Sequence, residues 1–150
     1  MPKKPVTILM ADDDADDRLL TREALEENPI AFDLYFVEDG EELMDYLNQR
    51  GKYTNPAKSP RPNLILLDLN MPKKDGREAI KEIKAVPALK RIPIIVLTTS
   101  QAEEDILQTY DLGVSSYITK PVTFDALVNV TKIIGNYWFE TVKLPPVMKD

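Results

Sequence analysis

Four short runs of apolar residues, rich in leucine and β-branched side chains, are separated by longer stretches of mixed polarity. The runs do not alternate between apolar and polar side chains, so each is predicted to be a strand buried on both faces. They cover residues 6–11, 34–37, 64–67 and 94–97, and a weaker fifth run at 116–119 follows Gly113.

The longer stretches have helical character. They cover residues 15–27, 41–50, 76–85, 102–111 and 123–138. Strand and helix therefore alternate five times, and this order favours a parallel sheet with helices on both faces. We predict an α/β fold with a doubly wound, five-stranded parallel sheet.

The length of the chain fits one domain. Its 150 residues are enough to bury about 68–70% of the surface that the unfolded form exposes. We expect one domain over 1–150, with a core at about 6–136, a loop insertion at 51–63 and a C-terminal extension at 137–150. The insertion holds one Gly and three Pro, a composition typical of a connecting segment.

Composition excludes several classes of chemistry. The 25 acidic residues exceed the 19 basic ones, and the net charge of −6 argues against binding to a nucleic-acid backbone. The chain has no Cys and no His, which excludes disulfides, thiolate zinc sites and Cys or Ser–His nucleophilic catalysis. No apolar stretch is long enough to span a membrane, so the expected location is the cytoplasm.

Charged and hydroxyl side chains follow four of the predicted strands. They belong to the segments Asp12-Asp13-Asp14, Asp68-Leu69-Asn70, Thr98-Thr99-Ser100 and Lys120-Pro121. Because function in an open parallel sheet gathers beyond the carboxyl ends of the strands, these side chains are expected to lie together. Clustered carboxylates favour a hard cation such as Mg²⁺, and a nearby lysine and hydroxyl favour a phosphoryl group as the metal's other partner.

The order of these motifs along the chain resembles that of the response-regulator receiver domains of two-component signalling. The resemblance covers about 6–136 and rests on Asp12-Asp13, on Asp68 in DLNMPKKDG, and on Thr98, Tyr117 and Lys120-Pro121. It implies the flavodoxin-like (CheY-like) strand order 2-1-3-4-5. The tracts YTNPAKSPRPNLILLDLNMPKKDGRE and NYWFETVKLP are also similar to stand-alone regulators associated with cyanobacterial phytochrome kinases. Similar single-domain regulators serve other sensor kinases, so this alternative stays open.

The resemblance implies a phosphate acceptor and a magnesium site. Asp68 would accept the phosphoryl group. Asp13, Asp68 and the backbone carbonyl of Asn70 would bind Mg²⁺, and Asp12 would act mostly through a metal-bound water. The implied activity is that of a phosphoacceptor that assists its own phosphotransfer and dephosphorylation, not that of a conventional enzyme.

Three further residues would sense the phosphoryl group. Lys120 would pair with one phosphoryl oxygen, Thr98 would donate a hydrogen bond to another, and Tyr117 would change its exposure. The family pattern also implies a cis peptide bond before Pro121. Since the chain has no His, a phosphohistidine donor must be another protein, namely a sensor histidine kinase, for which a phytochrome is one candidate. The output would be a protein contact through the fourth helix, fifth strand and fifth helix.

The acids between residues 12 and 17 allow two other interpretations. Asp14, Asp16 and Asp17 are expected to be solvated residues at a helix start, because acids favour the first helical turn. A calcium-binding loop would take its ligands from Asp12, Asp14, Asp16 and Glu23, but Asp17 stands where that loop requires glycine.

Two alternatives concern the function itself. A haloacid-dehalogenase-like phosphatase also forms an aspartyl phosphate, but its acidic pair comes late in the chain, whereas here the pair comes first. A pseudo-receiver acting only as a scaffold would lack part of the site, whereas every expected residue is present here.

The last predicted helix carries more apolar surface than a core needs. One stripe is formed by Phe124, Leu127, Val128, Thr131 and Ile134, and a second by Ala126, Val130, Ile133 and Tyr137. Together they cover roughly 220° of the helix, against about 100° for ordinary packing. We predict a homodimer through this helix. The alternative is that the C-terminal extension folds back over the second stripe.

Overall fold

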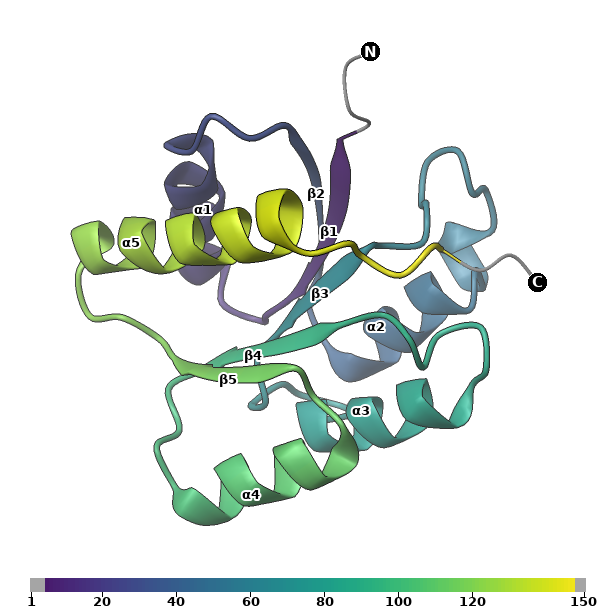
Figure 1. The fold of residues 1–150 in the computed structure, drawn as a ribbon. Helices are drawn as coiled ribbons and strands as arrows, with labels where there is room; N and C mark the ends of the chain where they lie inside the picture. The colour runs from purple at the N-terminus through teal and green to yellow at the C-terminus, as the bar shows by residue number, and fades with distance from the viewer. Residues whose placement is uncertain (1–4, 148–150) are drawn as a thin grey trace.

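The computed structural model describes residues 5–147 (Figure 1). Residues 1–4, and the last three residues of the predicted C-terminal extension, 148–150, lie outside the described residues. Five parallel strands form one sheet in the order β2-β1-β3-β4-β5, which confirms the predicted fold class and strand order. The strands are β1 Val6–Ala11, β2 Phe32–Val37, β3 Leu64–Leu67, β4 Ile94–Thr98 and β5 Ser116–Thr119.

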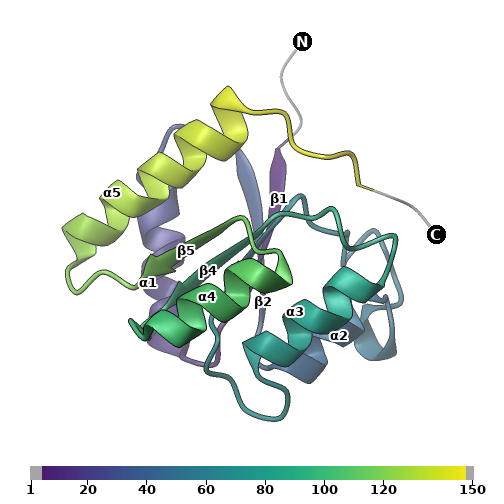
Figure 2. The same ribbon diagram turned by 60° about the horizontal axis from the view of Figure 1, so that its bottom comes forward.

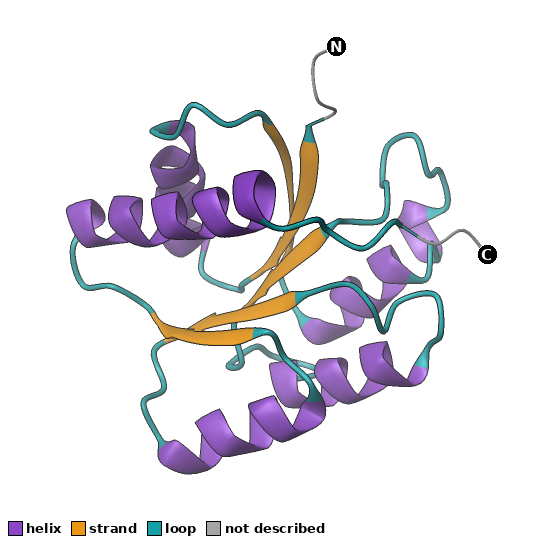
Figure 3. Ribbon diagram, in the orientation of Figure 1, coloured by secondary structure: helices purple, strands orange, loops and turns teal. Residues whose placement is uncertain are grey.

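Helices cover both faces of this sheet (Figure 3). They are α1 Ala15–Glu26, α2 Gly40–Leu47, α3 Gly76–Ala85, α4 Glu103–Leu112 and α5 Phe124–Gly135. α1 and α5 lie against one face, and α2, α3 and α4 lie against the other (Figure 1, Figure 2). No helix within residues 5–147 has the length and apolar character required to cross a membrane.

The two faces bury separate apolar clusters, and β1 contributes to both. Leu9 and Ala11 join the cluster under α2 and α3, whereas Ile8 and Met10 join the cluster under α1 and α5. Since successive strand residues point to opposite faces, a continuous apolar run is needed where both faces are covered. β2 begins at Phe32, two residues before its predicted start, because Phe32 and Asp33 pair in register with Val6 and Thr7.

The segment 51–63 is anchored to the helix that precedes it. After a single 3₁₀ turn at Gly51–Tyr53, the chain returns along the end of α2. Tyr46 Oη donates a hydrogen bond to the carbonyl oxygen of Pro60 at 2.8 Å, and Arg61 Nε donates to that of Leu47 at 3.1 Å. These contacts hold an otherwise irregular loop against the domain.

The end of α5 differs from the prediction. The helix passes into a π-helical segment, Asn136–Thr141, whose Phe139 is buried in the cluster under α1 and α5. Of the predicted second stripe, Ile133 and Tyr137 are 67% and 51% exposed. At these exposures both side chains are uncovered within residues 5–147, and the extension leads away from α5 (Figure 1, Figure 2).

Candidate functional site

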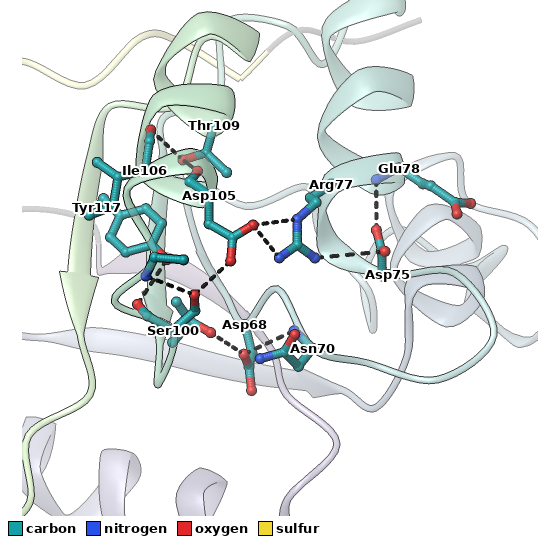
Figure 4. Close-up of polar contacts among 12 residues, drawn as sticks. Asp68, Asn70, Asp75, Arg77, Glu78, Ser100, Asp105, Ile106, Thr109 and Tyr117 are labelled. Atoms are coloured by element: carbon teal, nitrogen blue, oxygen red, sulfur yellow. Dashed lines mark hydrogen bonds and ion pairs between the residues drawn. The ribbon is translucent and has the colours of Figure 1, made fainter.

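Asp68 follows β3 at the carboxyl edge of the sheet and is held by neighbours on both of its carboxylate oxygens. Thr98 Oγ1, at the end of β4, donates a hydrogen bond to Asp68 Oδ1 at 2.8 Å. The backbone N–H of Asn70 donates to the same oxygen at 3.2 Å (Figure 4). The ammonium of Lys120, which follows β5, donates to Asp68 Oδ2 at 2.9 Å. With the side chain only 8% exposed, the carboxylate is fixed in one orientation.

A glycine allows α3 to begin close behind this carboxylate. A Cβ atom on Gly76 would lie 2.8 Å from the carbonyl oxygen of Asp68 and 2.8 Å from Cα of Leu69. Any other residue would collide with the backbone there. The side chain of Asp75 caps α3 by accepting a hydrogen bond from the N–H of Glu78 at 3.1 Å (Figure 4). The loop between Asp68 and α3 is therefore fixed at both ends.

Lys120 is surrounded by three carboxylates. Its Nζ lies 2.8 Å from Asp12 Oδ2, 2.6 Å from Asp17 Oδ2 and 2.9 Å from Asp68 Oδ2. Burial by itself would lower the pKa of this ammonium, but the three carboxylates outweigh burial and raise the pKa well above its ordinary value. Lys120 therefore remains a cation across the physiological pH range.

Asp12 is the most deeply buried acid of the site. Its Oδ1 accepts a hydrogen bond from the backbone N–H of Asp14 at 2.9 Å. Its Oδ2 has no hydrogen-bond donor among the described residues and meets only the Lys120 ion pair. Burial raises the pKa of the Asp12 carboxyl, and Lys120 opposes that rise. Asp12 Oδ2 is therefore a buried oxygen that could accept a further contact from a second cation.

The carboxylate cluster suits a hard metal ion. Asp12, Asp13 and Asp68 each offer one oxygen, and these oxygens lie within 4.8 Å of one another. Asp13 is exposed, whereas the other two are buried, so the cluster opens toward solvent on one side. Oxygen donors of this kind fit Mg²⁺ or a similar ion, with waters completing the coordination. The donor set of this chain therefore fits the metal site expected from the sequence.

Tyr117 lies beside this site in β5 and closes a chain of polar contacts. Tyr117 Oη donates to the carbonyl oxygen of Ser100 at 2.9 Å, and Ser100 Oγ donates to Asp105 Oδ2 at 2.6 Å (Figure 4). Arg77 of α3 donates to Asp105 Oδ1 through both Nε and Nη2, at 3.1 and 2.6 Å. The Ser100 hydroxyl and the Arg77 guanidinium hold the pKa of Asp105 below its ordinary value. These polar contacts together link β5, the β4–α4 loop, α4 and α3.

Comparison with known proteins identifies the family. The response regulator receiver domain matches residues 8–132. The response regulator Rcp1 of Synechocystis sp. is 48% identical over 141 residues, which are 94% of each protein.

The chain belongs to the response regulator receiver family. Among solved structures, the phosphorylated cyanobacterial phytochrome response regulator RcpA matches with a TM-score of 0.89 at 45% identity, over 95% of this chain and 100% of RcpA. The Mn²⁺-bound form of Rcp1 matches with a TM-score of 0.86 at 46% identity, over 95% and 100% of the two chains. Receiver domains bind a divalent metal, and in this receiver the acidic cluster of Asp12, Asp13 and Asp68 is the candidate site.

One expectation carried over from the receiver pattern is wrong for this structure. There is no cis peptide bond in residues 5–147, so the bond between Lys120 and Pro121 is trans. The trans form is favoured by about 0.5–1 kcal/mol for a bond before proline. With this bond trans, the N–H of Lys120 donates to the carbonyl oxygen of Thr98 at 2.7 Å and the ammonium meets all three carboxylates. The site of this receiver therefore forms without the cis isomer.

The structure adds side chains to the receiver site that the sequence did not single out. Asp17 was expected to be solvated, but it contacts Lys120. Arg18 Nη1 donates to the carbonyl oxygen of Asp12 at 2.7 Å and its Nη2 pairs with Glu38 at 3.1 Å, which supports the backbone of the acidic loop. The only available signal was position, since Asp17 and Arg18 lie in the first turn of the helix that follows the Asp12-Asp13 pair.

Proposed function

We propose that this receiver takes a phosphoryl group onto Asp68 from the phosphohistidine of a sensor kinase, in a Mg²⁺-dependent reaction. The observation that carries the proposal is the arrangement around Asp68, where a buried hydroxyl and a partly buried ammonium contact different oxygens of one carboxylate. A carboxylate serving only as a helix cap would need neither of these groups. A pseudo-receiver would not need them either.

The proposed transfer is a displacement at phosphorus. An oxygen of Asp68 forms a bond to phosphorus while the phosphorus–nitrogen bond of the donor histidine breaks and its electron pair returns to the imidazole. Lys120 stays protonated and stabilises negative charge on the phosphoryl oxygens. Thr98 Oγ1, which donates to Asp68 Oδ1 before transfer, would donate to a phosphoryl oxygen afterwards. The same groups would assist the later hydrolysis of the acyl phosphate.

For the metal, we propose direct binding of Mg²⁺ by Asp13, Asp68 and the backbone carbonyl of Asn70, with Asp12 acting through water. When bound, the ion neutralises charge on the carboxylates and on the incoming phosphoryl group. The fit rests on the oxygens of Asp12, Asp13 and Asp68 lying within 4.8 Å of one another. The unsatisfied Oδ2 of Asp12 gives a further reason for a cation there.

A phosphohistidine donor must be a second protein, because the chain has no histidine. We propose a sensor histidine kinase, and a phytochrome is the first kind to test. The support is the likeness to RcpA, described as a cyanobacterial phytochrome response regulator, over 95% of this chain. The net charge of −6 further favours a protein partner over a nucleic acid.

The output would pass through the surface formed by α4, β5 and α5. Leu107 and Tyr110 of α4 are 64% and 48% exposed, and Ile133 and Tyr137 near the end of α5 are also exposed. Exposed apolar side chains of this kind favour a protein contact. We propose that a homodimer forms through α5, that Tyr117 adjusts this surface when the site is phosphorylated, and that residues 1–150 act as one domain.

The test is label transfer from an autophosphorylated kinase to the purified chain, with Mg²⁺ and with a chelator. Transfer to wild type with Mg²⁺, and none to Asp68→Asn, is the expected result. Candidate kinases including a phytochrome would be compared at equal concentration. The proposal for the kinase fails if a phytochrome transfers no faster than unrelated sensor kinases, and the proposal for Asp68 fails if Asp68→Asn is labelled.

A further inference from the structure

The ammonium of Lys120 is already engaged by three carboxylates: it donates hydrogen bonds to Asp17 and Asp68 and forms an ion pair with Asp12. It carries three N–H groups, and three carboxylate oxygens, from Asp12, Asp17 and Asp68, lie 2.6–2.9 Å from its nitrogen. A phosphoryl group on Asp68 would bring new anionic oxygens that require this ammonium. The phosphoryl oxygens would take over the contact that the Asp68 carboxylate gives up when it becomes an acyl phosphate, and any further contact with the ammonium must come from Asp12 or Asp17.

The burial of the carboxylates indicates which of them gives up its contact with Lys120. The side chains of Asp12 and Asp68 are 0% and 8% exposed, whereas that of Asp17 is 34% exposed. A buried carboxylate that loses its cation is left without solvation, which is costly. Asp17 can exchange the ammonium for water at much lower cost. It is also the acid whose charge has no part in the proposed acyl phosphate or the proposed metal site.

Local structure holds Asp17 in reach of Lys120. Asp14 caps α1, and its Oδ1 accepts hydrogen bonds from the N–H groups of Asp16 and Asp17 at 2.8 and 3.3 Å. This cap fixes the first turn of the helix. Asp17 also lines a small pocket together with Lys120, Pro121 and Leu127, and its carboxylate contacts the ammonium directly at 2.6 Å.

We propose that Asp17 is a positioning residue that competes with the phosphoryl group for Lys120. In the unphosphorylated protein it occupies one N–H of the ammonium, and on phosphorylation it releases that N–H to the phosphoryl oxygens. Its carboxylate also repels the incoming anion. Asp17 therefore shifts the balance toward the unphosphorylated state and limits how long the signal is stored. The inference rests on the proposed phosphorylation of Asp68.

The test compares binding of beryllium trifluoride, a mimic of the aspartyl phosphoryl group, in the presence of Mg²⁺. Fluorine NMR of the bound mimic measures occupancy directly. Asp17→Asn is expected to bind it about three- to tenfold more tightly than wild type, which corresponds to about 0.7–1.4 kcal/mol. The acyl phosphate formed from acetyl phosphate should be longer-lived in the same variant. Asp17→Glu, which restores the carboxylate, should return both values toward wild type.

The matched control is Asp16→Asn, which makes the same charge change in the same helical turn at an exposed side chain. A second readout needs no phosphoryl group: the Cε and Nζ resonances of Lys120 in the free protein should move in Asp17→Asn but not in Asp16→Asn. Equal mimic affinities in the two variants would overturn the inference, as would unmoved Lys120 resonances. If wild type itself neither binds the mimic nor is phosphorylated, the proposed function fails instead.

Discussion

The phenolic oxygen of Tyr117 donates a 2.9 Å hydrogen bond to the carbonyl oxygen of Ser100, and so joins β5 to the loop that carries β4 into α4. The hydroxyl of the same serine donates to Asp105 in the first turn of α4, and Asp105 accepts two further hydrogen bonds from Arg77. The position of Tyr117, next to the candidate site, is thereby coupled to the start of α4. A change in the position of Tyr117 would therefore be transmitted to α4 through Ser100 and Asp105.

Arg77→Ala should weaken this coupling and change how stability depends on pH. The pKa of Asp105 in the folded protein lies below its unfolded value of 3.8. The unfolded state therefore binds the proton more readily, so the stabilisation is complete above that value and is lost as pH falls through the lower folded pKa. Without Arg77, the drop in unfolding free energy below about pH 4 should be shallower.

Urea unfolding of wild type and Arg77→Ala between pH 3 and pH 7 measures this effect. At pH 7 the variant should be destabilised by about 0.5–1 kcal/mol, the upper range for an ion pair near the surface. Lys81→Ala, at an exposed position of the same helix, is the control. Parallel stability curves for Arg77→Ala and wild type across the acid range would show that Arg77 does not act on Asp105.

Asp13→Ala should lose most of the affinity for Mg²⁺, because it removes an exposed member of the carboxylate cluster without disturbing a buried contact. Calorimetric titration of the metal measures this loss. Asp16→Ala removes a nearby exposed acid that is not part of the cluster, and should leave the affinity nearly unchanged. An Asp13→Ala affinity equal to that of the Asp16 control would remove Asp13 from the metal site.

Lys120→Ala should destabilise the metal-free protein strongly and the Mg²⁺-bound protein much less. Removing the ammonium leaves Asp12 and Asp68 buried without a cation, a change that typically costs about 3–5 kcal/mol. A bound Mg²⁺ would supply the missing positive charge. The free energy of unfolding, measured with and without Mg²⁺, should show this difference. The variant should still bind the metal but fail to switch on phosphorylation; an equal loss of stability under both conditions would contradict the account.

Ile133→Glu should give a folded monomer if α5 forms the proposed homodimer. The side chain is 67% exposed in one chain, so the charge should not disturb the fold, whereas burial in an interface would exclude it. Light scattering at high micromolar concentration, with and without beryllium trifluoride, measures the mass. Thr54→Glu places the same charge on the exposed loop and is the control. Wild type that is monomeric in both conditions would rule the dimer out.

Much of the fold and the residues of the site could be predicted from the sequence. The five apolar runs gave the strands because buried parallel strands need continuous apolar side chains, and strand ends carry Asp12, Asp68, Thr98 and Lys120 to one edge. β2 was predicted too short because its first residues, Phe32 and Asp33, include a charged side chain that an apolar run excludes. Their inclusion depends on pairing with β1, which is a tertiary relationship.

The contacts around the site could not be predicted in the same way. Asp17 resembles any acid in a first helical turn, and only the packing of α1 beside α5, which Lys120 precedes, brings it to Lys120. Arg77 and Asp105 are 28 residues apart, on helices whose polar sides carry several other charges. The isomer of the bond before Pro121 was inferred from the family and not from local physics. Each depends on distances between elements that a periodic pattern does not contain.

The central claim is that Asp68 is the phosphate acceptor, and intact-protein mass spectrometry after incubation with acetyl phosphate and Mg²⁺ tests it most directly. The account predicts that wild type gains the mass of one phosphoryl group, and that hydroxylamine, which cleaves acyl phosphates, removes it. Asp68→Asn, nearly identical in shape, should gain nothing while keeping the wild-type fold by circular dichroism. A hydroxylamine-sensitive phosphoryl group on Asp68→Asn, or a wild type that gains none under conditions where Mg²⁺ binds, would contradict the claim.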